Sequence, residues 1–148
     1  MTDISSNYLY LLRGLPGSGK TTLAQDLAQM YDAMGYAVTV LAADDYFYDD
    51  QGNYNFDRNS LLKAHGICQL KAQEAMIHTK TNKPRAVFIH NTSTMEKELK
   101  PYLEMVEVSS VDWIVRSLVV ENRHGNSSTH GVPDHTLEAM RDRFSLKL

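Results

Sequence analysis

The feature that most constrains this chain is a glycine-rich segment, residues 14–21, with the sequence GLPGSGKT. It matches the pattern G-x-x-x-x-G-K-[ST] at every fixed position. Glycines let a backbone wrap closely around a phosphate group, and successive N–H groups then point into the concavity. A short apolar run, residues 8–13, precedes the segment, and residues with helical spacing follow it from Lys20. This strand–loop–helix order is typical of a loop that binds the phosphates of a nucleoside triphosphate.

The residue types in this segment each suit one part of such a ligand. Lys20 is expected to reach the β- and γ-phosphates as a positive charge, and the Thr21 hydroxyl is a hard oxygen ligand for Mg²⁺. The helix that begins there directs the positive end of its dipole at the anion. Lys20 is therefore a candidate catalytic residue, and Thr21 is the candidate metal ligand. The residues expected to bind the nucleotide are Gly14, Pro16, Gly17, Ser18, Gly19, Lys20, Thr21 and Thr22.

Strand-like and helix-like segments alternate along the whole chain. This alternation predicts a single α/β domain, residues 1–148, with a four-stranded, mostly parallel sheet and helices on both of its faces in three layers. On the second helix, Leu61, His65, Cys68 and Ala72 share the face expected to point inward, where His65 is interpreted as a core histidine. The predicted strands are 8–13, 37–41, 85–89 and 111–120, and the predicted helices are 20–34, 60–80, 95–106 with a disturbance at Pro101, and 133–144.

Composition excludes several classes of protein. With 148 residues, 43% hydrophobic and 22% charged, the chain has the values of one globular domain and not those of a disordered or fibrous protein. Its net charge of −3 is unlike that of proteins that coat long nucleic acids, so any contact with nucleic acid must be local. The single cysteine, Cys68, cannot form an internal disulfide. The early apolar run of the chain is too short for a signal peptide or a membrane span, so a cytoplasmic protein without membrane contact is expected.

An acidic and aromatic loop follows the second predicted strand. Asp44 and Asp45 lie just beyond the carboxyl end of that strand, where open α/β sheets bind their ligands. A carboxylate there suits phosphoryl transfer, because it can accept the proton of an attacking hydroxyl and align its oxygen. Two adjacent carboxylates point in different directions, so one can face the acceptor while the other anchors the loop. The aromatic residues nearby can either stack a base or pack on one another; they are Tyr46, Phe47, Tyr48, Tyr54 and Phe56.

Polar residues also follow the third and fourth predicted strands. Many phosphate-loop enzymes place an Asp after the third of these strands, whereas this chain has Asn91 and Thr92, which either substitute as neutral hydrogen-bonding groups or cap the next helix. Arg123 opens a polar loop after the fourth strand. We expect residues 121–132 to form a lid that brings the Arg123 guanidinium to the transferred phosphate, so that Arg123 is the third candidate catalytic residue with Lys20 and Asp44.

Taken together, these segments resemble the polynucleotide-kinase-like P-loop family. The resemblance rests on residues 13–22, on Asp44-Asp45-Tyr46-Phe47, on Asn91-Thr92, and on a late arginine followed by residues 130–133. The family includes phage polynucleotide 5′-hydroxyl kinases, the N-terminal domain of the vertebrate cyclic-nucleotide phosphodiesterase and many uncharacterised ATP-binding proteins. Characterised polynucleotide kinases place an Arg near the position of Phe47 and an Asp where this chain has Asn91.

The resemblance implies a function as well as a fold. It implies a P-loop kinase that binds ATP with Mg²⁺, uses Asp44 as the base and carries Arg123 on its lid. The favoured reaction moves the γ-phosphate of ATP to the 5′-hydroxyl end of a short DNA or RNA. Two alternatives stay open: a kinase for a nucleoside or another small metabolite, and a nucleotide-binding module that regulates a protein partner.

Overall fold

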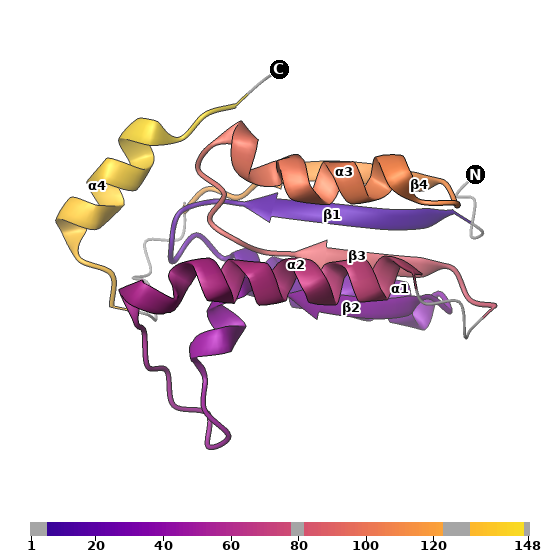
Figure 1. The fold of residues 1–148 in the computed structure, drawn as a ribbon, viewed down its shortest axis with the longest axis horizontal. Coiled ribbons are helices and arrows are strands. Elements are labelled where there is room, and N and C mark those ends of the chain that lie inside the picture. The colour runs from indigo at the N-terminus through magenta and orange to yellow at the C-terminus, as the bar shows by residue number, and fades with distance from the viewer. Residues whose placement is uncertain (1–5, 78–81, 123–130, 147–148) are drawn as a thin grey trace.

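The computed structural model describes residues 6–77, 82–122 and 131–146, and its centre is one parallel β-sheet. The strands lie in the order β2-β3-β1-β4, and every neighbouring pair is parallel (Figure 1). Because parallel strands end at the same edge, the loops that follow β1, β2 and β3 meet there. The predicted four-stranded parallel sheet is confirmed. Its strands are β1 (Asn7–Arg13), β2 (Ala37–Leu41), β3 (Arg85–Ile89) and β4 (Trp113–Val119).

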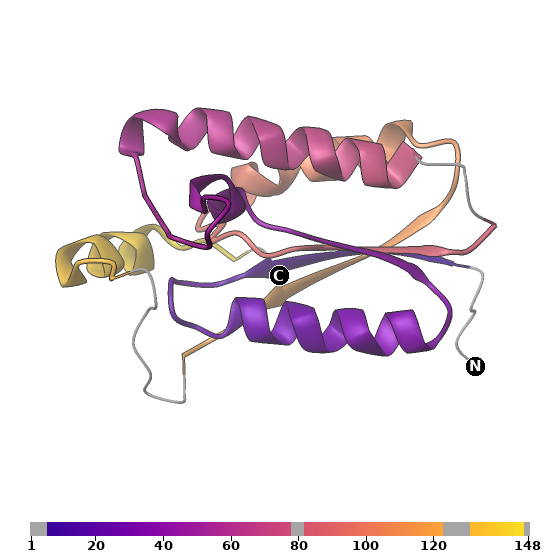
Figure 2. The same cartoon turned by 90° about the horizontal axis from the view of Figure 1, so that it is seen from below.

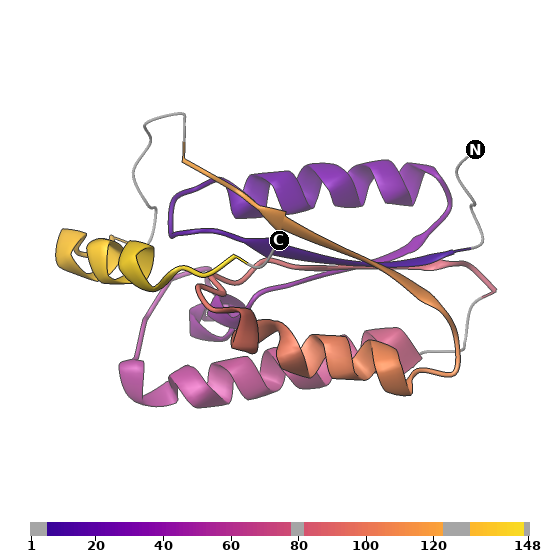
Figure 3. The same cartoon turned by 90° about the horizontal axis from the view of Figure 1, so that it is seen from above.

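Helices cover both faces of the sheet, as the sequence predicted. Helix α1 (Lys20–Ala33) lies on one face, and α2 (Leu61–Ile77) and α3 (Lys100–Val108) lie on the other (Figures 2 and 3). Helix α4 (Asp134–Arg143) lies beyond the carboxyl ends of the strands and buries none of its residues (Figure 1). Among the described helices, none is long and apolar enough to cross a membrane.

The side-chain alternation of β1 divides the interior into two clusters. Leu9 and Leu11 point to the side of α2 and α3, where they join buried residues such as Cys68 and Tyr102. Tyr8 and Leu12 point to the side of α1 and pack with aromatic rings there. Successive residues of a strand face opposite sides, so a central strand that is covered on both faces directs apolar side chains to both.

Three local predictions need correction. Pro101 does not disturb a helix: a 3₁₀ turn (Glu96–Leu99) comes first, and Pro101 stands in the first turn of α3, where its missing N–H would have no partner anyway. Leu61 does not face the core, since it is 37% exposed and Ala64 is buried in its place. The fourth strand begins at Trp113, two residues later than predicted.

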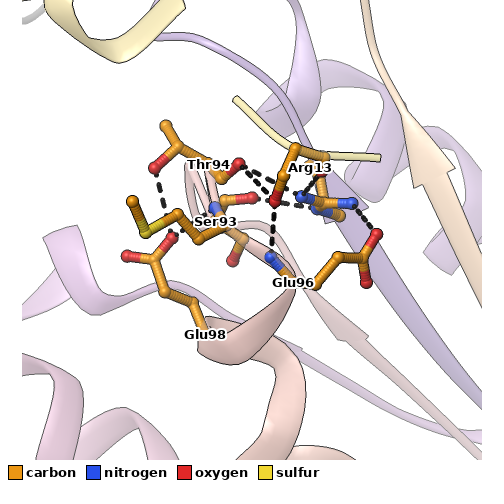
Figure 4. A network of polar contacts seen from close by, with 7 residues as sticks. Arg13, Ser93, Thr94, Glu96 and Glu98 are labelled. Atoms are coloured by element: carbon orange, nitrogen blue, oxygen red, sulfur yellow. Dashed lines mark hydrogen bonds and ion pairs between the residues drawn. The ribbon is translucent and has the colours of Figure 1, made fainter. Parts of the chain in front are cut away.

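A buried arginine joins the end of β1 to the end of the chain. The Arg13 side chain donates to the backbone oxygens of Ser93 (2.9 Å), Thr94 (3.4 Å) and Ser145 (2.6 Å), and to the carboxylate of Glu96 (3.0 Å) (Figure 4). Its guanidinium also lies over the ring of Phe144, 4.9 Å from the centroid. Arg13 thus fixes the loop after β3 and the segment after α4 next to the start of the glycine-rich loop.

Candidate active site

The glycine-rich loop, residues 14–19, connects β1 to α1 at the carboxyl edge of the sheet. Gly17 has φ 80° and Gly19 has φ 101°, in the left-handed region that glycine adopts without strain. Gly19 leads directly into α1, and no side chain caps the first turn of that helix in the described part of the chain. The first amides of α1 therefore remain available to an anion, as a phosphate site requires.

The loop is closely packed and contains one unmet hydrogen bond. A Cβ on Gly14 would collide with the backbone oxygen of Val120 and with the side chain of Ser18, so only glycine fits there. Ser18 is 3% exposed, and its hydroxyl has no hydrogen-bond partner among the described residues. Leaving a buried hydroxyl without a partner is costly. An anion with acceptor oxygens in the loop would supply the partner, so the donor set fits a nucleotide phosphate.

Lys20 lies folded over this same loop. Its Nζ donates to the backbone oxygens of Gly14 (2.7 Å) and Leu15 (3.0 Å). Burial lowers the pKa of Lys20 to about 8, and the negative charge of Asp44 partly opposes that shift. The charge of Asp44 acts on Lys20 because the loops after β1 and β2 lie at the same edge of the sheet.

The Thr21 hydroxyl is exposed and has a histidine beside it. Thr21 Oγ1 and His90 Nδ1 are 3.3 Å apart. His90 is the first residue after β3, and burial lowers its pKa, an effect that Asp45 opposes and Lys20 adds to. Sequence reasoning looked for an Asp after this strand and overlooked His90, although its place directly behind a buried strand was the available signal. In the described residues no group of three or more His, Cys, Asp and Glu could hold a metal ion. Thr21 fits Mg²⁺ in the usual way for that ion, which is held by few protein oxygens together with substrate phosphates.

Asp44 and Asp45 have different surroundings within the 3₁₀ turn (Ala43–Phe47) that follows β2. The backbone N–H of Ala42 donates to Asp45 Oδ2 (3.1 Å), so Asp45 closes the turn on itself. The Tyr54 hydroxyl donates to Asp44 Oδ1 (3.2 Å), and this hydrogen bond orients the Asp44 carboxylate. The negative charge of that carboxylate acts on Lys20. Asp45 thus holds the turn together, and the role of Asp44 toward a substrate stays a prediction.

Asn91 has a packing role in this structure. It is 6% exposed; its amide oxygen accepts from the backbone N–H of Ala43 (2.7 Å), and its amide nitrogen lies 3.4 Å from the Tyr102 hydroxyl. These contacts tie the turn that holds Asp44 to α3. Asn91 therefore positions the acidic turn, and His90 is the residue after β3 that stands beside the candidate metal ligand.

The aromatic residues of the loop pack on one another, with part of their surface left open. Phe47 is 4% exposed and contacts the rings of Tyr46, Tyr54 and Phe56, so it belongs to the core. Tyr46 is 37% exposed, and the ammonium of Lys63 lies 5.8 Å from its ring centroid. Packing accounts for Phe47, and the Tyr46 ring with Lys63 forms a cationic aromatic surface two residues from Asp44.

Arg123 and most of the expected lid, residues 121–132, lie outside the described residues. Of the other expected nucleotide contacts, Pro16 is half-buried in the loop and Thr22 is exposed in the first turn of α1.

Comparison with known proteins places the chain in a family. The sequence model of the family AAA_33, described as an AAA domain, matches residues 9–146. The chain belongs to this family. Part of the AAA domain is 42% identical to NEDD4-binding protein 2 of Homo sapiens over 97 residues, which are 66% of this chain and 5% of that protein. A shorter stretch is 51% identical over 39 residues to the signal recognition particle 54 kDa protein of Hyperthermus butylicus, 26% of this chain and 9% of that one. The AAA domain thus spans only a small part of either relative.

Solved structures with the same fold include a kinase. Kti12 of Chaetomium thermophilum, in complex with ADP-AlF3, has a TM-score of 0.65 at 16% identity, covering 93% of this chain and 80% of that one. The APS kinase CysC of Mycobacterium tuberculosis has a TM-score of 0.53 at 14% identity, covering 93% and 96%. The Pnkp1/Rnl/Hen1 complex has a TM-score of 0.56 at 16% identity, covering 93% and 40%. These likenesses establish the α/β phosphate-loop fold of the AAA domain.

Proposed function

We propose that this chain is an ATP-dependent phosphotransferase that moves the γ-phosphate to a hydroxyl, with a 5′-hydroxyl end of a short DNA or RNA as the favoured acceptor. The observation that carries the proposal is the arrangement of the sheet, in which the loops after the parallel strands β1 and β2 end at one edge and carry Lys20 and Asp44. A cation on the phosphates and a carboxylate at the acceptor oxygen are the two groups that such a transfer needs. Kinases among the structures of the same fold, and the polynucleotide-kinase-like resemblance, agree with it.

In this proposal each residue acts on one part of the reaction. The glycine-rich loop and Lys20 bind and orient the phosphates, and the Thr21 hydroxyl together with nucleotide oxygens would hold Mg²⁺, which supplies positive charge at the phosphates when bound. Asp44 takes the proton of the acceptor hydroxyl. The acceptor oxygen bonds to the γ-phosphorus as the bond to the β–γ bridging oxygen breaks, and ADP leaves. Arg123, on a lid formed by residues 121–132, is proposed to neutralise charge on the transferred group.

The acceptor class rests on the surface beside Asp44. The exposed Tyr46 ring with Lys63 above it combines a face for stacking a base with a charge for a backbone phosphate. Since the chain carries a net charge of −3, this contact must be local, which suits the end of a strand better than a long duplex.

The experiment is a transfer assay with ATP labelled on the γ-phosphate. The acceptors are 5′-hydroxyl oligonucleotides, nucleosides and small alcohols. Label is expected on the oligonucleotide, with an affinity that weakens as salt rises, because phosphate contacts release counterions. Label on nucleosides or alcohols alone would replace the acceptor class and keep the kinase.

Two matched variants test the assigned base. Asp44→Asn keeps the shape of the side chain, so ATP affinity should survive while transfer falls by roughly 10²–10⁴-fold. Asp45→Asn removes the same charge one residue away, and its amide oxygen still accepts from Ala42, so transfer should change little. If neither variant slows transfer to any acceptor, the proposal loses its base, and a nucleotide-binding module that acts on a protein partner becomes the better account.

A further inference from the structure

His90 lies beside the hydroxyl of Thr21, the candidate metal ligand at the end of the glycine-rich loop. Strand β3 is the neighbour of β1 in the sheet, with Ile89 paired to Leu11, so the residue after β3 comes beside the loop after β1. The imidazole Nδ1 of His90 lies 3.3 Å from Thr21 Oγ1 across 69 residues of sequence. In P-loop enzymes of known mechanism, the Ser or Thr of the loop shares the metal with an Asp from a neighbouring strand.

The backbone holds His90 in this place from both sides. Its N–H donates to the backbone oxygen of Leu41 (3.0 Å), at the end of β2. The next residue, Asn91, is buried and bonded to the N–H of Ala43 (2.7 Å). The strand end and the acidic turn therefore fix the backbone from which the imidazole reaches Thr21.

We propose that His90 is the positioning residue that accepts the Thr21 hydroxyl proton in a hydrogen bond and so leaves the Thr21 oxygen free for the divalent cation of the bound nucleotide. This inference rests on the nucleotide binding in the proposed function. It goes beyond that function because it assigns the orientation of the metal-binding hydroxyl to a neutral imidazole. With Nδ1 as acceptor, the hydroxyl hydrogen points to His90, and the oxygen lone pairs point away from it.

An imidazole in this place differs from a carboxylate in one measurable respect. It supplies the hydrogen bond without the negative charge, so it orients Thr21 and adds no direct attraction to the cation. Replacing the imidazole with a carboxylate should therefore increase the enhancement of nucleotide affinity by the metal, whereas removing the acceptor should decrease it.

The test measures ADP affinity by calorimetry, with Mg²⁺ and with a chelator, and expresses the result as the ratio of the two dissociation constants. His90→Phe should reduce the enhancement by Mg²⁺ about three- to tenfold, the worth of one hydrogen bond, and leave metal-free ADP affinity unchanged. His90→Asp should restore or exceed the original enhancement. Ser110→Asp, which adds the same charge at an exposed position before β4 at the opposite edge of the sheet, should leave the ratio unchanged.

A double-mutant cycle separates a positioning role from a structural one. If His90 acts through the hydroxyl, His90→Phe should have no further effect on the ratio in a Thr21→Ala background. An effect of equal size in that background, or a loss of ADP affinity that is the same with and without Mg²⁺, would overturn the inference. Because no transfer is measured, a failed acceptor screen leaves this result standing, whereas an unmodified chain that binds no ADP overturns both proposals.

Discussion

Replacing the buried Arg13 with methionine should lower the free energy of unfolding by about 3 kcal/mol. The side chain is fully buried and donates to backbone oxygens of Ser93, Thr94 and Ser145 and to the carboxylate of Glu96. Removing one member of a buried ion pair typically costs about 3–5 kcal/mol. The Glu96 side chain is 37% exposed and can regain water, which places the expected loss at the lower end. Methionine keeps most of the apolar stem, so little of the loss comes from a cavity.

Urea unfolding followed by circular dichroism measures this loss. For a chain of this size, about 3 kcal/mol corresponds to a fall in the melting temperature of roughly 6–12 °C. Arg116→Met is the matched control, since Arg116 lies on the adjacent strand β4 with an exposed side chain, and it should change stability by less than about 0.5 kcal/mol. A loss below about 1 kcal/mol for Arg13→Met, or equal losses in the two variants, would refute the role given to Arg13. The amide of Ser145, which donates to the backbone oxygen of Thr94 (2.6 Å), should then also exchange no faster in the variant.

Three further predictions concern the site. The pKa of Lys20 is about 8, so in the free chain its ammonium group loses a proton as pH rises through 8. Bound nucleotide phosphates should restore that proton. Calorimetry in buffers of different ionisation enthalpy should therefore show uptake of about 0.5 proton at pH 8 and about 0.1 at pH 7 when the nucleotide binds. Tyr54→Phe removes the donor to Asp44 and should slow transfer about three- to tenfold at unchanged ATP affinity, as steady-state kinetics would show. Gly14→Ala forces a Cβ against the backbone oxygen of Val120 and should destabilise the chain by about 1–3 kcal/mol in thermal unfolding.

The fold was predictable because its signals are local. Periods of two and 3.6 residues identify strands and helices, and the β2 and β3 segments begin and end where the sequence predicted. The predictions were wrong where one residue is compatible with two local structures. Pro101 either breaks a helix or opens one, and a 3₁₀ turn before it decided between them. Leu61 has the spacing expected of the buried face of α2, but it is the first residue of that helix, and the buried face begins at Ala64.

The candidate site was only partly predictable, because its contacts join distant segments. The sheet topology brings the loops after β1 and β2 to one edge, so the sequence alone could predict that Lys20 and Asp44 lie at that edge. Arg13 could not be interpreted in this way, since its partners Ser93 and Ser145 are 80 and 132 residues further along the chain. The structure buries the Arg13 side chain in a network of backbone oxygens and the Glu96 carboxylate. Nothing in its neighbours indicated that.

Charge explains why a histidine can serve at the end of β3. The turn after β2 carries two carboxylates, Asp44 and Asp45, and both act electrostatically on His90. A nucleoside triphosphate carries several negative charges, so a third carboxylate beside Thr21 would repel it whenever the metal is absent. A neutral imidazole avoids this repulsion and still accepts from the Thr21 hydroxyl. In the proposed site, an imidazole at this place would therefore let the nucleotide enter before the cation is bound.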